Sequence, residues 1–253
     1  VNPIPSVPVV TALPSAICSG SNTTLTANSN LITTPYCIPT TDCSYGNFIS
    51  SFQLGAINHT SYACDADTGY IYLPTPAASL MVDSTYNFTL EVDESSSDNI
   101  VTIWIDFNHN HSFEASERVY NDGNGLYYSG SITIPSNAFN GVTRMRVRNF
   151  RHYYFVDTLD ACATSWDDGV GAGLAVSGGA RYISYTNQGE TEDYDVNISG
   201  GTDPVTLNWS PSTFLSSTSG SSVTATNVTS TTTYTVSSSA TSSGCSATGS
   251  GSV

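Results

Sequence analysis

The chain has 253 residues, a formal net charge of −15 and 11% charged residues, and all six basic residues are arginine. This balance excludes nucleic acid as an expected partner, because phosphate contacts need clustered Lys and Arg. No apolar run reaches the ~18 residues of a membrane-spanning helix, so we expect no membrane insertion.

Charge divides the chain into three parts. Residues 1–41 and 204–253 contain no Asp, Glu, Lys or Arg, and every charged residue lies from Asp42 to Asp203. The two flanks therefore resemble each other and differ from the middle. The simplest interpretation is one discontinuous domain, residues 1–34 and 201–253, with a second domain of residues 35–200 inserted into it.

The first flank predicts two short strands, around Val7–Thr11 and Ala16–Ala27. In the second flank, β-branched alternation predicts four more, at 204–209, 222–226, 232–236 and 244–248. Together the flanks supply enough strands for an immunoglobulin-like sandwich with Trp209 in its core.

The middle predicts an all-β sandwich, because no segment keeps a helical period. The candidate strands are 48–57, 69–73, 86–92, 100–107, 126–134, 142–148, 181–186 and 192–198, and Gly169–Gly179 is expected to be a long loop. We expect antiparallel pairing in a jelly-roll-like sandwich. The overall fold class is therefore a jelly-roll-like β-sandwich inserted into a discontinuous immunoglobulin-like β-sandwich.

The stretch from Asp106 to Glu117 has the ligand spacing of a calcium loop, with oxygen-bearing side chains at alternate positions. Position 6 is His111 where glycine is usual, and two asparagines reduce the charge, so binding is expected to be weak. The alternative is a polar turn without metal. The predicted calcium ligands are Asp106, Asn108, Asn110, Ser112, Glu114, Glu117 and Asp193.

Residues 189–194, GETEDY, form the densest acidic motif. On a strand, Glu190 and Glu192 share one face and Asp193 points to the other. These carboxylates either complete the calcium shell or pair with the alternating Arg144, Arg146 and Arg148. We favour the arginine pairing, with Asp193 as the acid nearest the metal.

Six cysteines without a CxxC motif, in a lysine-free chain rich in Ser and Thr, predict three disulfides in an oxidising compartment. The sequence leaves the pairing open, and our assignment is Cys18–Cys245, Cys37–Cys43 and Cys64–Cys162. The acids near Cys162 predict a solvated loop or a second cation site, and they are Asp157, Asp160, Asp167 and Asp168.

Paired aromatic residues suggest either half-buried packing or exposed platforms for sugars. They are Tyr70 and Tyr72, Tyr127 and Tyr128, and Tyr153 and Tyr154 beside His152. Asn-x-Ser/Thr sequons allow glycosylation, and they begin at Asn22, Asn58, Asn87, Asn110, Asn197, Asn208 and Asn227. No nucleophile, zinc or phosphate-loop motif is present, so we expect no enzyme.

The flanks, through phrases such as ICSGSNTTLTA and LNWSPSTFLSSTSG, resemble the Ig-like repeats of large secreted bacterial surface proteins. The middle resembles the GEVED domain of secreted bacterial proteins, a non-catalytic β-sandwich by implication. The segments that carry this second resemblance are Tyr36–Pro39, Trp104–Asn108, Phe113–Glu114 with Glu117, Gly130–Pro135, Thr143–Arg148 and Gly189–Tyr194.

These resemblances predict a structural or adhesive module of a secreted, cell-surface bacterial protein or fibre. Residues near Val1–Val10 either complete the Ig-like domain of a neighbouring copy head-to-tail, or form an ordinary linker with Pro3, Pro5 and Pro8. The expected partners are copies of the chain or neighbouring repeats. The alternatives are a lectin-like module that binds surface glycans and, third, a glycoside hydrolase with paired carboxylates.

Overall fold

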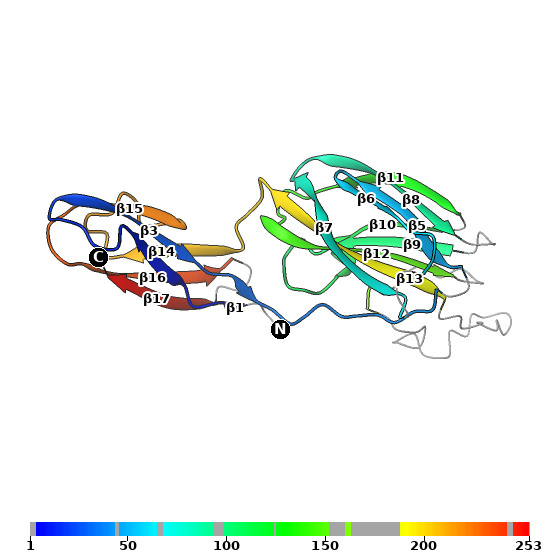
Figure 1. Ribbon diagram of the computed structural model, residues 1–253, viewed down its shortest axis with the longest axis horizontal. Coiled ribbons are helices and arrows are strands. Elements are labelled where there is room, and N and C mark those ends of the chain that lie inside the picture. Colours follow the sequence, from blue (N-terminus) through cyan, green and yellow to red (C-terminus); the bar gives the residue numbers. More distant parts are fainter. Residues whose placement is uncertain are drawn as a thin grey trace. The chain divides into compact units, whose positions relative to one another are not determined.

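A computed structural model describes residues 4–43, 46–64, 68–93, 99–123, 125–151, 160–162, 188–241 and 245–252. It is built of strands, with a single 3-10 turn and no α-helix in the described parts, so the prediction of an all-β fold is confirmed (Figure 1). Its contacts divide the chain into two units. The first is Val1–Thr34, Asn108–Asn110 and Asp203–Val253, and the second is Pro35–Phe107 and His111–Thr202.

The first unit contains two three-stranded sheets, ordered β15-β3-β2 and β14-β16-β17, and a short β1-β4 pair. Its strands are β1 (Ile4–Pro5), β2 (Val9–Leu13), β3 (Ser21–Asn28), β4 (Leu31–Ile32), β14 (Val205–Ser210), β15 (Ser222–Val228), β16 (Thr233–Ala240) and β17 (Ser246–Ser252). This is the A-B-E and C-F-G arrangement of an immunoglobulin-like sandwich.

Alternation explains the core of the first unit. On β16 the side chains of Tyr234 and Val236 point inward between exposed threonines, as the period of two requires. They pack in one cluster with Leu25 and Trp209. The indole of Trp209, 3% exposed, donates from Nε1 to the carbonyl oxygen of Gly220 at 2.8 Å. The prediction that Trp209 fills this core is confirmed.

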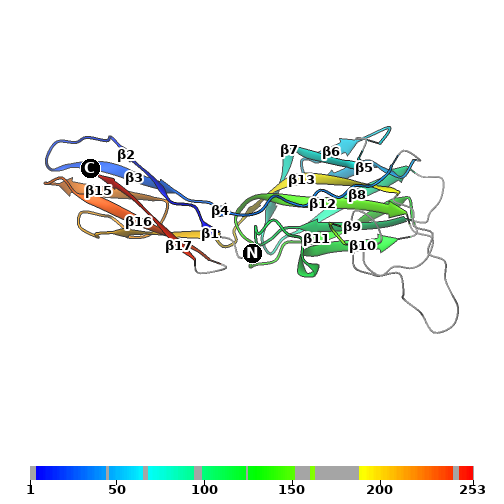
Figure 2. The ribbon, with the colours of Figure 1, turned by 90° about the horizontal axis from the view of Figure 1, so that it is seen from below.

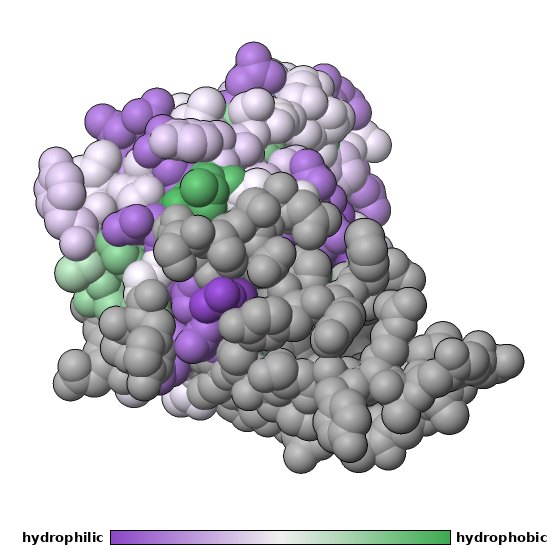
Figure 3. All heavy atoms as spheres, turned by 90° about the vertical axis from the view of Figure 1, so that its right-hand side faces the viewer, coloured by the Kyte–Doolittle hydropathy of each residue, from purple (hydrophilic) through white to green (hydrophobic). Residues whose placement is uncertain are grey.

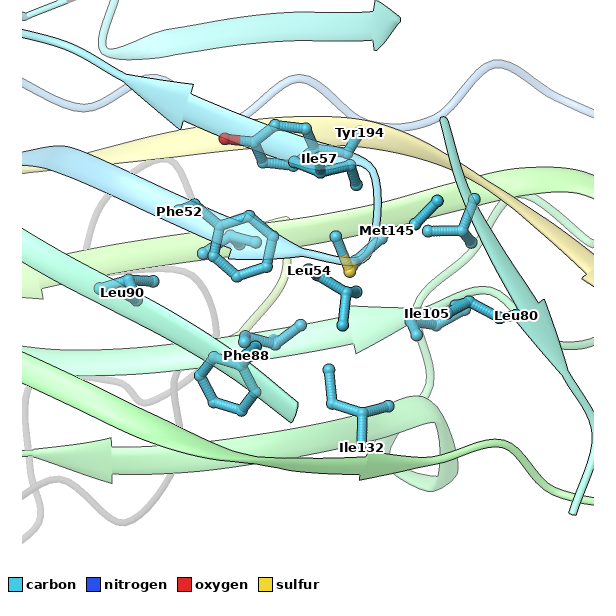
Figure 4. Packing of buried hydrophobic residues seen from close by; sticks show 14 of the residues in the cluster. Phe52, Leu54, Ile57, Leu80, Phe88, Leu90, Ile105, Ile132, Met145 and Tyr194 are labelled. Atoms are coloured by element: carbon cyan, nitrogen blue, oxygen red, sulfur yellow. The ribbon is translucent and has the colours of Figure 1, made fainter. Parts of the chain in front are cut away.

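The second unit is a sandwich of a five-stranded sheet, β10-β9-β12-β13-β7, and a four-stranded sheet, β11-β8-β5-β6 (Figure 2). Its strands are β5 (Phe48–Leu54), β6 (Ile57–Thr60), β7 (Tyr70–Met81), β8 (Thr85–Asp93), β9 (Asn99–Ile105), β10 (Arg118–Gly123), β11 (Tyr127–Thr133), β12 (Gly141–Arg151) and β13 (Gly189–Ser199). Phe52, Phe88, Ile105 and other apolar side chains fill the space between the sheets (Figure 4).

Several strand predictions were wrong in detail. The expected strand 48–57 is a hairpin, because Gly55 adopts φ +57° in a two-residue turn between Leu54 and Ile57. β10 was missed, and β7 runs past Pro74 to Met81 at the edge of its sheet. β7 pairs with β13 in parallel, so the sandwich is not wholly antiparallel. The predicted strand 181–186 and the loop 169–179 lie outside the described residues.

The outer face of the five-stranded sheet is covered. All seven residues of β9 are buried, and so are the first six of β13, although each strand has only one face toward the core. Residues 36–37 and 160–162, joined by the Cys37–Cys162 disulfide, lie against this face and are called the cover below. On the face seen in Figure 3, hydrophobic described residues form only small groups.

The predicted disulfide pairing was wrong. Cys37 is bonded to Cys162 and Cys43 to Cys64, with Cα–Cα distances of 5.6 and 5.4 Å. Cys18 and Cys245 are not joined. Cys18 follows β2 at the end of the first unit where Ser21 pairs with Val228, whereas Cys245 precedes β17 near the other end. A disulfide cannot span opposite ends of a sandwich.

Candidate functional site

The loop after β9 folds back on its first residue. Asp106 is fully buried, and its Oδ2 accepts hydrogen bonds from the amide of His111 at 3.0 Å and from the hydroxyl of Tyr36. Asn108 Oδ1 accepts from the amide of Asn110 at 3.0 Å. His111 has φ +63°, the left-handed conformation for which a calcium loop uses glycine at its sixth position. The backbone therefore has the expected turn despite the missing glycine.

Glu117 joins the two ends of this loop. Its Oε1 accepts from the amide of Phe107 at 2.9 Å, and its Oε2 accepts from the amide of Glu114 at 3.1 Å. Burial, hydrogen bonding with Glu114 and the charge of Asp106 raise the pKa of Glu117 to about 9. The carboxyl group thus closes the loop through backbone contacts.

Two of the seven predicted calcium ligands, Asp193 and Glu117, are engaged with other groups. Asp193 is paired with arginine, and both oxygens of Glu117 bind amides. Among described residues, the group of Cys, His and acidic ligand atoms within 4.8 Å of one another is Cys43, Cys64 and Glu190, and its cysteines are bridged. Calcium binding by Asp106, Asn108, Asn110 and Ser112 stays a prediction.

Asp193 lies on the outer face of the sheet, directly opposite Arg146 on β12. Arg146 holds it with two bonds, Nε to Oδ1 at 2.7 Å and Nη2 to Oδ2 at 2.9 Å, and both side chains are fully buried. Arg144 Nη1 and the hydroxyl of Tyr70 also donate to Oδ2, at 3.3 and 2.9 Å. The favoured arginine pairing thus occurs at Asp193, the acid expected to lie nearest the metal.

Glu190 and Glu192 point to the opposite face, as the alternation predicted. Their partners named below are not arginines, so the favoured arginine pairing was wrong for these two residues. Glu190 Oε2 accepts from the amide of Ile49 at 2.8 Å. Glu192 Oε1 lies 3.3 Å from His59 Nε2, and its Oε2 accepts from the hydroxyl of Tyr194. Sequence reasoning missed His59, because its strand is distant in the chain and only the fold brings it to Glu192.

The buried arginines hold the cover to the sheet. Arg146 Nη1 donates to the carbonyl oxygen of Ala161 at 2.7 Å and contacts Cys37 Sγ at 3.0 Å, and Nη2 donates to the carbonyl oxygen of Cys37 at 2.7 Å. Arg148 donates to the carbonyl oxygen of Asp160 and to Thr191 Oγ1. Burial and the neighbouring Arg146 lower the pKa of Arg148 to about 9.

The other predicted features are placed as follows. Asp160 Oδ1 accepts from the amide of Cys162 at 2.7 Å, whereas Asp157, Asp167, Asp168 and the His152–Tyr154 segment lie outside the described residues. Tyr72 is 40% exposed and Tyr127 76%, whereas Tyr128 is buried. Of the sequon asparagines, Asn110 is partly buried and the others are exposed.

Two disulfides indicate a compartment outside the reducing cytoplasm. No helix among the described residues is long and apolar enough to cross a membrane. A search of the curated proteins finds no match to the chain. Residues 100–197, which run from β9 into β13 and include the loop and the arginine strand, match the model of the GEVED domain, so the resemblance seen in the sequence is confirmed for this stretch.

Proposed function

We propose that this chain is a non-catalytic structural module of an extracellular bacterial surface protein or fibre. The observation that carries the proposal is that the carboxylates of the acidic motif, residues 189–194, are buried and paired inside the protein. Glu190, Glu192 and Asp193 are each 0% exposed. Glu190 binds a backbone amide, Glu192 contacts a histidine and a tyrosine, and Asp193 binds two arginines. A catalytic carboxylate must reach a substrate. These carboxylates are instead internal cross-links between strands.

Location outside the cell is supported by the disulfide-linked cover on the second unit. The cover adds a disulfide and several charge-assisted hydrogen bonds over the outer face of the sheet. Disulfides persist in oxidising compartments outside the cytoplasm. Antibodies against the chain should label intact cells, and external protease should remove the label. Labelling that requires permeabilised cells would contradict a surface location.

Absence of catalysis is tested directly. The full chain should release no reducing sugar from a panel of neutral and acidic polysaccharides over a day. Turnover that disappears when a single acid is changed, for example in Glu192→Gln, would replace the structural role by glycoside hydrolysis. Asp122→Asn, on the edge strand β10, is the control for nonspecific effects of removing a charge.

Head-to-tail assembly, as we propose it, is an exchange of the first strands between copies. Within one chain β2 pairs with its own β3 from Val9–Asn28 to Leu13–Thr24, and a side chain at Gly249 on β17 would overlap the carbonyl oxygen of Pro8. Residues 4–13 thus fit closely against both sheets of an Ig-like unit. Exchange would give each unit the same contacts from a neighbour.

A locked variant tests this exchange without removing the strand. Thr11 and Thr26 are cross-strand partners whose Oγ1 atoms lie 2.5 Å apart, so Thr11→Cys with Thr26→Cys should bridge β2 to β3 of the same chain. The unlocked chain should form polymers in negative-stain images, and the oxidised locked chain should stay monomeric. The control is the variant Thr11→Ser with Thr26→Ser, which cannot form this disulfide. Polymers of the locked chain would exclude strand exchange.

A further inference from the structure

A pocket of about 550 Å³ lies on the outer face of the five-stranded sheet, beside the cover. Tyr70 and Tyr72 line it from β7, Arg144 from β12 and Asp195 from β13, and Tyr36 and His111 also line it. All six belong to the second unit. Its volume falls within the range of small-molecule sites.

Arg144, one of the residues that line this pocket, is held by two aromatic rings. Its guanidinium carbon lies 3.8 Å from the ring centre of Tyr72 and 4.6 Å from that of Tyr36. Nη1 of Arg144 donates to Asp193 at 3.3 Å, and the buried Nε of Arg144 donates to no described atom. A planar donor fixed in this way presents its N–H groups in a constant direction.

The aromatic walls are equally fixed. The hydroxyl of Tyr72 donates to Asp195 Oδ1, and that of Tyr70 to Asp193 Oδ2, each at 2.9 Å. The ring of Tyr36 stacks on the imidazole of His111, with centroids 4.3 Å apart and an interplanar angle of 16°. A pocket whose walls are ordered before binding loses little conformational entropy when a ligand enters.

Charge selects the class of ligand. The chain carries a net charge of −15, and Asp195 adds a carboxylate to the pocket wall, so an anion is repelled. A cation would face the guanidinium of Arg144. The remaining chemistry is uncharged, with apolar faces for the rings and hydroxyl groups for Arg144 and Asp195.

We propose that this pocket binds a neutral saccharide. One face of a sugar ring packs on Tyr72 or Tyr70, and its hydroxyl groups donate to Asp195 and accept from Arg144. The inference concerns this pocket alone and does not depend on strand exchange or on the structural role of the chain.

Calorimetric titration of the full chain tests the proposal with hexasaccharides of glucose, mannose, galactose and N-acetylglucosamine, and with an oligogalacturonate of equal length. At least one neutral probe should bind saturably and more tightly than the acidic one. Tyr72→Ala and Asp195→Asn should each weaken that binding about tenfold or more. Tyr127→Ala, on an exposed tyrosine of β11 in the other sheet, should bind like the parent.

Three results would overturn the proposal: no neutral probe binds at millimolar concentration, the acidic probe binds more tightly, or both pocket variants bind like the parent. Asp195→Asn keeps the shape of the side chain and an acceptor for Tyr72, so it separates loss of recognition from loss of fold. Thermal unfolding of each variant verifies that the second unit is intact.

Discussion

At the scale of single residues, the pair of Arg146 and Asp193 has the clearest energetic consequence. Both side chains are fully buried, and Arg146 also satisfies two carbonyl groups of the cover. Arg146→Met leaves a buried carboxylate and two carbonyl groups without their main donor. We expect a loss of about 3–5 kcal/mol in the free energy of unfolding, measured by denaturant titration with the disulfides intact.

The matched controls use the same measurement. Arg118→Met, on a partly exposed arginine at the start of β10, should cost less than about 1 kcal/mol. Arg146→Met combined with Asp193→Leu should cost less than Arg146→Met alone, because the fully buried carboxylate is then removed together with its main partner. A single variant as stable as the parent would show that the pair contributes little.

The two disulfides should differ in their rate of reduction. Arg146 Nη1 lies 3.0 Å from Cys37 Sγ and stabilises a leaving thiolate, whereas Glu190 Oε1 lies 3.7 Å from Cys43 Sγ and disfavours one. Limited dithiothreitol followed by alkylation and peptide mapping should find Cys37 and Cys162 labelled first. Glu190→Gln should accelerate reduction of Cys43–Cys64 alone. Equal rates for both bridges in the parent would contradict the electrostatic argument.

The sequence pattern predicted on which face of a strand a side chain lies better than it predicted which residue that side chain contacts. Alternation placed Arg144, Arg146 and Arg148 on one face and separated Asp193 from Glu192, and the structure agrees. The cysteine pairing could not be predicted, because it depends on which loop covers the outer face of the sheet. An unusual row of arginines on one strand, in a chain with six cysteines, was the available signal for the cover.

At the scale of elements, the loop of residues 106–117 supports a calcium titration. His111 adopts the required left-handed conformation, and Asp106 and Asn108 already turn the backbone through their side-chain oxygens. Extracellular calcium sites of low charge have dissociation constants of about 0.1–1 mM. We expect 10 mM calcium chloride, roughly ten times the upper value, to raise Tm saturably, and chelator to reverse the rise.

The control for this titration is Asn108→Ala, which removes a predicted ligand near the surface while leaving the Asp106 contacts in place. Its Tm should not respond to calcium. Magnesium chloride at the same ionic strength should have a smaller effect than calcium. A parent chain whose Tm is the same in calcium and in chelator would exclude a calcium site and leave the loop as a polar turn.

Elements at edges were predicted less well than central ones. β10 was missed because its sequence, RVYNDG, has little apolar alternation and pairs only with β9. β7 was cut short at its prolines, although an edge strand tolerates them. By contrast β9, β11 and β12, which carry clear apolar patterns, were expected within a few residues of their bounds.

At the scale of the whole molecule, the division into two units follows the distribution of charge. The uncharged flanks and the charged middle each contain their own buried cluster, one around Trp209 and Tyr234 and one around Phe52 and Phe88. Polar surface in the flanks is supplied by Ser and Thr, so these strands keep alternation without ionic side chains. The sequence could show this contrast because it concerns composition and needs no knowledge of contacts.

Two separate cores predict two unfolding transitions in calorimetry of the full chain. Trp209→Ala removes the largest side chain of the first core and should cost that unit about 3–5 kcal/mol, moving one transition to lower temperature. Phe52→Ala, fully buried in the second core, should move the other transition by a similar amount. The assignment is independent for each unit, because neither cluster contains a residue of the other.

Each of these two variants serves as the control for the other, because each leaves the core of the other unit unchanged. Tyr62→Phe, on a side chain 96% exposed, should move neither transition. A single transition that shifts with both core variants would mean that the units unfold together. Two transitions of which each responds to only one variant would establish that the two units are separate cooperative units.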